Sequence, residues 1–511
     1  MTSNSLEKQP QLFGHPVGLY VLFFTEMWER FSYYGMRAIF VLYLTATTIG
    51  ENPGLGWLEG DAISLYGWYT MFVYVASIPG GILADRYLGQ RKTVMLGGAL
   101  LVAGHSILAI EAMWAWYTGL ILIVLGVGCL KPNISTMVGG LYGKGDKRRD
   151  MGFYIFYMGI NLGAAASALL VGYVGEEIGW HYGFGLAGIG MALGQVVYIY
   201  GQKYLTHVGN LVEKPKSEKG EGKNLIGDIF KHTNSIIGFA VMIALAIIIY
   251  LTSGSVSYSL LVAGLAFAVG VGIVVYNDGN QVEKDRILVT YLSFLIIITF
   301  WGAFEQAGGL MNIYADQKTD LHLTSSLEIP ASWFQSVNAI FILMFATLVG
   351  SFWAWWRNRG KESSSLFKMG IGVIIMGWGF LFMSMASKEV TYDAAGEVLT
   401  KSSMVWLLLA YLFHTIGELC ASPVALSFIT KLSPARWVAF MMGAYFAATG
   451  LGNKVAGLLG ESAGELGEFN LFTGIAVFCT IIGILVIIML KPLKRLTHGA
   501  EEMDTKEPET V

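Results

Sequence analysis

Long apolar stretches recur along almost the whole chain, and they constrain the fold more than any other feature. A helix of roughly 20 apolar residues crosses ~30 Å of hydrocarbon at ~1.5 Å per residue. Fourteen such stretches can be counted, at residues 15–47, 63–84, 93–112, 115–138, 151–174, 183–204, 234–252, 256–276, 288–312, 332–354, 368–386, 404–430, 437–459 and 470–490. Of the 511 residues, 54% are hydrophobic and 14% are charged, a balance outside the range of soluble globular domains. The sequence therefore predicts an all-α integral membrane protein with fourteen transmembrane helices.

The basic residues indicate the orientation of these spans, because Lys and Arg accumulate in cytoplasmic loops. We assume an even number of spans and a cytoplasmic amino end. The basic residues that then lie outside the cytoplasmic side are Lys318, Lys388 and Lys401 in outer loops, and Arg30, Arg37, Lys131 and Lys454 within spans. The other 26 of the 33 Lys and Arg then lie on the cytoplasmic side. We therefore expect a multi-pass protein of the inner (plasma) membrane with both termini cytoplasmic.

A hydrophilic run divides the chain. Six spans precede residue 205, and residues 214–223 (KPKSEKGEGK) have the composition of a linker. The next two spans contain no Asp, Glu, Lys or Arg and are joined by a short turn, so they form a predicted hairpin outside the two bundles. The predicted parts are a six-helix bundle at 1–207, a cytoplasmic linker with two extra transmembrane helices at 208–282, a second six-helix bundle at 283–495 and a cytoplasmic tail at 496–511.

The first span carries the densest set of charges. Glu26, Arg30, Tyr33 and Arg37 are spaced i, i+4, i+7 and i+11, so they share one helix face over ~16 Å, with Glu29 at its flank. Charge is costly in hydrocarbon, so this face cannot point at lipid. One interpretation is a static ion-pair ladder between helices. The other is a cluster whose carboxylates switch between paired and protonated states and so couple protonation to another ligand.

Single charged residues in other spans are divided mostly by sign between the two predicted bundles. Lys131 lies in the first predicted bundle, and Glu305 and Glu418 lie in the second. Basic charge is thus concentrated in one bundle and acidic charge in the other, and a short zwitterion fits between two such walls. The alternative is that Lys131 with Glu418, and Arg37 with Glu305, are salt bridges that bind no ligand.

Three motifs resemble those of a known family. The segments are Glu26-x-x-Glu29-Arg30-Phe-x-Tyr-Tyr34, the cytoplasmic loop at residues 80–91 (GGILADRYLGQR), and residues 156–163 (FYMGINLG). The loop resembles the signature of the major facilitator superfamily, and together the motifs resemble the proton-dependent oligopeptide transporter (POT/PTR) family, bacterial type. The resemblance implies the major facilitator fold, with two six-helix bundles around a central cavity, plus the inserted two-helix hairpin.

The resemblance also implies a function. It is that of a symporter that imports di- and tripeptides by alternating access, with protons as the coupling ion and no other cofactor, in a lipid bilayer and without nucleic acid. Proton coupling would involve Glu26, Glu29, Arg30 and Glu305, and the gating salt bridges would be Arg37–Glu305 and Lys131–Glu418. The residues implied in peptide binding are Arg30, Tyr34, Arg37, Tyr74, Lys131, Tyr157, Asn161, Trp301, Asn338, Glu418, Ser422 and Trp437. Animal members use a histidine in the second helix, which this span lacks, so proton handling must rest on carboxylates.

Other classes of function are less well supported. A transporter of another small anion such as nitrate is the main alternative, although a simple anion site has little use for Glu418. A peptide-sensing receptor would be expected to carry a sizeable signalling domain. An enzyme is not expected: Gly460-Glu-Ser462-Ala-Gly464 fits G-x-S-x-G but ends a predicted membrane helix and is not a strand-to-helix turn. Cys129, Cys420 and Cys479 show no paired spacing, so neither a disulfide nor a metal site is predicted.

Overall fold

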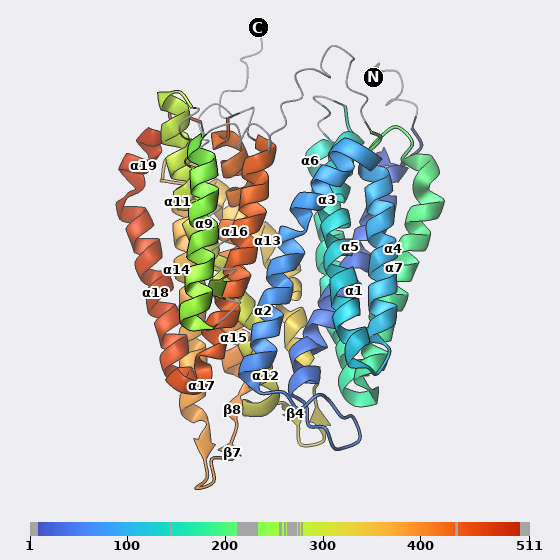
Figure 1. The fold of residues 1–511 in the computed structure, drawn as a ribbon, viewed down its shortest axis with the longest axis vertical. Helices are drawn as coiled ribbons and strands as arrows, with labels where there is room; N and C mark the ends of the chain where they lie inside the picture. The colour runs from blue at the N-terminus through green and yellow to red at the C-terminus, as the bar shows by residue number, and fades with distance from the viewer. Residues whose placement is uncertain are drawn as a thin grey trace.

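Helices from the first part of the chain lie on one side of the molecule and helices from the later part lie on the other, in the computed structural model (Figure 1). The structure describes residues 9–143, 146, 148–211, 233–254, 258–259, 262, 273, 276, 279–434 and 438–500.

On the first side, the helical elements are α1 (Val17–Thr45), α2 (Glu59–Val75), α3 (Ser77–Leu83), η2 (Ala84–Leu88), α4 (Gln90–Leu108), α5 (Met113–Gly140), α6 (Arg149–Ser167), η3 (Ala168–Gly172), η4 (Val174–Ile178), α7 (Trp180–Gly201) and η5 (Gln202–Tyr204). We call this group the N half. Its central helix is α1, which packs against both α6 and α7.

On the second side, the elements are α9 (Thr233–Ser253), α11 (Gln281–Phe304), η7 (Glu305–Gly308), α12 (Leu310–Lys318), η8 (Ala331–Trp333), α13 (Phe334–Asn358), α14 (Ser365–Glu389), α15 (Met404–Leu432), α16 (Val438–Glu461), α17 (Ala463–Leu466), α18 (Glu468–Ile488) and α19 (Leu490–Leu496). The elements from α11 onward are called the C half. In it, α14 packs between α15 and α18.

Short strands lie in segments outside the helices. Near the amino end, β1 (Gln11–Leu12) pairs antiparallel with β2 (His15–Pro16). In the C half, β3 (Thr319–Asp320) pairs parallel with β8 (Ser402–Ser403), while β4 (His322–Thr324) with β5 (Leu327–Glu328) and β6 (Thr391–Tyr392) with β7 (Val398–Thr400) form antiparallel hairpins. Figure 1 shows β4, β7 and β8 at the end of the bundle opposite α19. We call that end, with residues 319–328 and 391–403, the strand end.

Nine helical segments of the described residues are long and apolar enough to cross a membrane, including the segments at 113–140, 404–432 and 468–488. The expected all-α membrane architecture is thus confirmed. Helix α1 is not among the nine, because Glu26, Glu29, Arg30 and Arg37 interrupt its apolar length. The second helix of the predicted hairpin, at 256–276, lies outside the described residues apart from isolated positions.

Two of the expected spans contain an irregular turn, although each remains one helical stretch long enough to cross a membrane. The predicted span 63–84 consists of α2 and α3, which meet at Ala76, and the predicted span 288–312 passes from α11 through the four-residue turn η7 into α12. The turn at η7 puts Glu305 at a helix end.

The two halves meet where α2 packs against α16 and where α6 packs against α13. At the first contact, a Cβ added to Gly67 would lie 3.0 Å from the Cα of Gly457, so the two backbones touch. Nearby, Lys454 Nζ of α16 lies 3.2 Å from Glu461 Oε1 and 3.5 Å from Ser64 Oγ of α2. Close packing and a buried cation therefore hold α2 to α16.

Candidate functional site

The carboxylates of Glu26 and Glu29 both approach one guanidinium. Arg30 Nε lies 2.8 Å from Glu26 Oε1 and 2.8 Å from Glu29 Oε2, and all three side chains are buried. Helical spacing brings Glu26 to Arg30 and to Glu29, because residues three and four apart share a face, whereas Glu29 reaches Arg30 as its neighbour in the chain. The single Nε–H hydrogen bonds to Glu26, so Glu29 is held by charge alone, with no hydrogen-bond donor to either oxygen in the described residues. Glu29 is therefore the less firmly held of the two carboxylates.

A second ion pair joins the two halves. Arg37 Nη2 of α1 lies 3.1 Å from Glu305 Oε2 of η7, and Tyr66 of α2 donates its hydroxyl to the same oxygen at 2.9 Å. The Arg37 guanidinium also lies over the rings of Tyr34 and Tyr66, at 5.5 and 5.8 Å from their centroids. The structure therefore forms the predicted pair of Arg37 with Glu305, buried and surrounded by aromatic rings.

The other predicted pair, Lys131 with Glu418, is not formed in this structure. Lys131 Nζ instead lies 3.7 Å from the centroid of the Tyr74 ring, and it forms no ion pair within the described residues. Glu418 Oε2 accepts a hydrogen bond of 2.9 Å from Asn338 Nδ2, which also lies 3.1 Å from Thr415 Oγ1. Each charge thus has a neutral partner from its own half, so both remain available to a charged ligand.

Tyr157 and Asn161 lie one helical turn apart on α6. Asn161 Nδ2 donates to the Tyr157 carbonyl oxygen at 3.0 Å, and Tyr157 lies close enough to Glu418 to interact electrostatically. The Tyr157 side chain is nevertheless 38% exposed. Tyr34 on α1 is within electrostatic range of Arg30 and of Glu418. Tyr34 and Tyr157 of the N half therefore both lie within electrostatic range of Glu418 of the C half.

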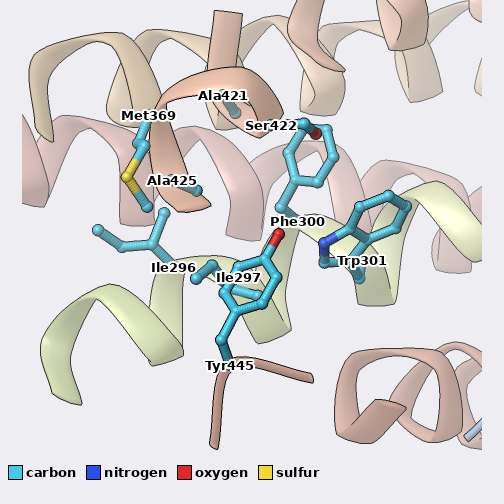
Figure 2. A pocket seen from close by; sticks show the side chains of 9 residues that line it. All are labelled: Ile296, Ile297, Phe300, Trp301, Met369, Ala421, Ser422, Ala425 and Tyr445. Atoms are coloured by element: carbon cyan, nitrogen blue, oxygen red, sulfur yellow. The ribbon is translucent and has the colours of Figure 1, made fainter. Parts of the chain in front are cut away.

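Trp301 and Ser422 line a pocket within the C half. Figure 2 shows their side chains with those of Phe300 and Tyr445; the full lining is Ile296, Ile297, Phe300, Trp301, Met369, Ala421, Ser422, Ala425 and Tyr445. The Ser422 hydroxyl has no hydrogen-bond partner in the part of the chain that the structure describes. The cavity that these side chains enclose measures about 10 Å³, which is room for no more than one water molecule. Trp437 lies outside the described residues.

Tyr445 was missed by sequence analysis. It lines the pocket with Trp301 and is also within electrostatic range of Glu418. Tyrosine is frequent in this chain, with 25 occurrences, and the predicted span 437–459 also holds the polar residues Thr449, Asn453 and Lys454, so nothing in it singles out Tyr445. Tyr445 and Glu418 lie on different predicted spans, so their positions in the sequence did not indicate that they are close in space.

The comparisons with known proteins agree with each other. The model of the POT family matches residues 91–465. Over 96% of this chain and 97% of the relative, the sequence is 36% identical to the uncharacterized transporter YclF of Bacillus subtilis. It is 34% identical to the peptide transporter YePEPT of Yersinia enterocolitica, over 99% of both chains, and 34% identical to a di-/tripeptide transporter of Lactococcus lactis, over 96% of this chain and 98% of the relative.

Solved structures are similar over the same length. A crystal structure of peptide transporter POT in complex with sulfate matches with a TM-score of 0.83 at 34% identity, covering 97% of this chain and 99% of that chain. A mutant form of peptide transporter POT in complex with alafosfalin matches with a TM-score of 0.82 at 33% identity, covering 97% and 99%. The predicted major facilitator fold is thereby confirmed.

Proposed function

The chain belongs to the POT family, and we propose that it is a proton-coupled symporter that imports di- and tripeptides by alternating access. It acts as a transporter and not as an enzyme. Its relatives include proteins named as peptide and di-/tripeptide transporters, which supports a peptide substrate. It works in the inner (plasma) membrane with both termini in the cytoplasm, so the strand end is the external end.

One observation carries the peptide assignment. Lys131 on the N half and Glu418 on the C half are opposite charges that do not neutralise each other and are held by Tyr74 and by Asn338. A peptide presents a carboxylate at one end and an ammonium at the other, so it can satisfy both charges at once. A small inorganic anion leaves Glu418 unsatisfied.

The two ends of the peptide meet different residues. Its carboxylate is received by Lys131, with Arg30 and Arg37 adding positive charge, through charge-assisted hydrogen bonds. Its ammonium is received by Glu418, Asn161 and Asn338. Because Asn338 Nδ2 is already committed to Glu418, the Asn338 amide oxygen faces the ammonium. The side-chain pockets comprise Tyr34, Tyr74, Tyr157, Trp301, Ser422 and Trp437, to which we add Tyr445.

The proton enters at the carboxylates beside Arg30. A proton on Glu29 neutralises that carboxylate and removes one of the two charges that hold Arg30. Arg30 is then attracted more strongly to the peptide carboxylate, so proton and peptide bind together. Loss of the proton after the halves have rocked restores the ion pair and releases the peptide. Glu305 couples to the same cycle because its pairing with Arg37 closes the strand end.

The substrate assignment is tested by counterflow. Proteoliposomes containing the purified protein and unlabelled dialanine are placed in labelled dialanine, and competitors are added outside. We expect competition by dialanine, and much weaker competition by its N-acetyl derivative, by its amide and by nitrate. Exchange of labelled nitrate without exchange of dialanine would contradict the peptide assignment and favour an anion transporter.

A further inference from the structure

The carboxylate of Glu176 crosses from the N half to the C half at the strand end. Its Oε2 accepts a hydrogen bond from the backbone N–H of Ala331 and its Oε1 accepts one from the N–H of Ser332, both at 3.0 Å. Ala331 and Ser332 begin η8, which leads directly into α13. The first N–H groups of a helix have no partner within the helix, and a carboxylate there also complements the helix dipole. Glu176 thus caps a helix that belongs to the opposite half.

The N half fixes Glu176 in place for this contact. Asn52, in the loop after α1, donates its Nδ2 to the carbonyl oxygens of Gly175 and Glu176, at 2.7 and 3.0 Å. The Asn52 side-chain oxygen in turn accepts from the Trp180 N–H at 3.2 Å. These bonds tie the turn between η4 and α7 to the loop after α1. Glu176 is therefore positioned by its own half before it meets the other.

Other contacts accompany the cap along the same seam. Trp333 Nε1 donates to the Leu169 carbonyl oxygen at 3.1 Å, and Ser336 Oγ donates to that of Ala165 at 2.7 Å. Gly172 lies so close to Ser332 that a Cβ at position 172 would overlap the Ser332 side chain. Direct contacts close the seam between α6, η3 and η4 on one side and η8 and α13 on the other, and Glu176 is the charged residue in it.

We infer that Glu176 is an external latch: its carboxylate stabilises the state closed at the strand end by capping α13 through η8, and it must release Ala331 and Ser332 for peptide to enter. The inference rests on the proposed alternating-access function. The latch is separate from Arg37 and Glu305, which join α1 to η7, because it joins η4 to η8. In the open state the N–H groups of Ala331 and Ser332 bond to water from outside, so the cost of opening is the exchange of two charge-assisted hydrogen bonds for bonds to water.

The test measures how far the strand end is open. Spin labels at Glu51→Cys, in the loop after α1, and at Ser325→Cys, in the β4–β5 turn, report the distance between the halves at this end by pulsed electron resonance. Both positions are exposed, whereas the native Cys129, Cys420 and Cys479 are buried. Glu176→Gln keeps the side-chain size and removes the charge. Glu177→Gln is the matched control, because Glu177 is adjacent and exposed.

We expect Glu176→Gln to raise the ratio of the long-distance to the short-distance population about tenfold, and Glu177→Gln to leave it unchanged. Ala331→Pro removes the N–H that the C half donates to Glu176. Proline is compatible with this position, because Ala331 is the first residue of η8 and follows an extended residue. This substitution should produce a similar shift, and adding it to Glu176→Gln should shift the ratio little further.

The inference is overturned if Glu176→Gln has the same distance distribution as Glu177→Gln in protein that still elutes as one folded species. Counterflow of dialanine by the native protein distinguishes a failure of the latch from a failure of the proposed function. Counterflow without any shift in Glu176→Gln rejects the latch alone, whereas absence of counterflow in the native protein rejects the proposed function.

Discussion

Lys131 Nζ lies 3.7 Å from the centroid of the Tyr74 ring and forms no ion pair within the described residues. A cation held against an aromatic face keeps its charge available to an incoming anion. The peptide carboxylate is that anion in our account. We therefore expect Lys131→Gln to raise the dialanine concentration for half-maximal uptake about tenfold or more, since a hydrogen bond between charged groups contributes ~1.5–3 kcal/mol.

Comparison with a substrate that lacks the carboxylate makes this prediction specific. Native protein should strongly prefer dialanine over dialanine amide, and Lys131→Gln should lose most of that preference. Tyr74→Phe is the control, because it keeps the aromatic ring. An unchanged preference in Lys131→Gln would show that another residue receives the carboxylate.

The hydroxyl of Tyr66 should matter more than that of Tyr69, one helical turn away on α2. Tyr66 donates to Glu305 at 2.9 Å, whereas the Tyr69 hydroxyl has no hydrogen-bond partner in the described residues. Loss of a buried hydrogen bond to a charged group costs about 1.5–3 kcal/mol. We expect Tyr66→Phe to lower the thermal unfolding midpoint of the purified protein. Tyr69→Phe should leave it unchanged, and equal effects of the two substitutions would contradict the geometry of the gate.

Gly457 should tolerate no larger residue, because α2 and α16 touch at this point. A Cβ on Gly457 would lie 3.0 Å from the Cα of Gly67, and backbone atoms cannot give way as a flexible side chain can. Gly457→Val should therefore reduce both dialanine uptake and thermal stability. Gly474→Val on α18 is the matched control, since open space surrounds a Cβ at that position. Full uptake by Gly457→Val would mean that the two halves do not need this contact.

The ion pair between Glu362 and Lys494 links the loop after α13 to α19 outside the membrane. Partial burial acts to raise the pKa of Glu362, but hydrogen bonds from Lys494 and Ser364 prevail and lower it to about 2. A carboxyl with a lowered pKa stabilises the fold above its unfolded pKa of ~4.3, and this contribution is lost as the pH falls toward 2.

The pair is partly exposed, so its contribution is below ~1 kcal/mol. Lys494→Gln should slightly lower the unfolding midpoint at pH 7, and the difference from native protein should shrink between pH 4 and pH 2. Lys491→Gln, an exposed neighbour on α19, should show no such difference. A difference that persists unchanged at pH 2 would contradict the assignment to Glu362.

Sequence analysis predicted most of the membrane helices because each follows from a local apolar stretch. It also placed Glu26 with Arg30, since they are one helical turn apart, and Glu29 at the flank of the same face. The turn at Ala76 has a local cause that the span count overlooked, because Pro79 has no N–H to bond the carbonyl of Val75. The turn at η7 was not predicted either, and there Glu305 pairs with Arg37 and accepts a hydrogen bond from Tyr66.

Contacts between distant segments were harder to predict. The cap of η8 by Glu176 joins residues 155 positions apart, and neither segment carries a motif that signals the other. The separate partners of Lys131 and Glu418 also required the structure, because the two charges alone suggest a pair. Tyr445 belongs to the same class, since only the fold brings it to Trp301.

The most direct test of the central claim is uptake of labelled dialanine into proteoliposomes with and without an inward proton gradient, for the native protein and for Glu29→Gln. We predict that the gradient drives accumulation in the native protein, and that Glu29→Gln loses accumulation while it keeps counterflow. Accumulation of equal size in Glu29→Gln would contradict the role of this carboxylate. Native uptake that is unaffected by the gradient would contradict proton-coupled symport itself.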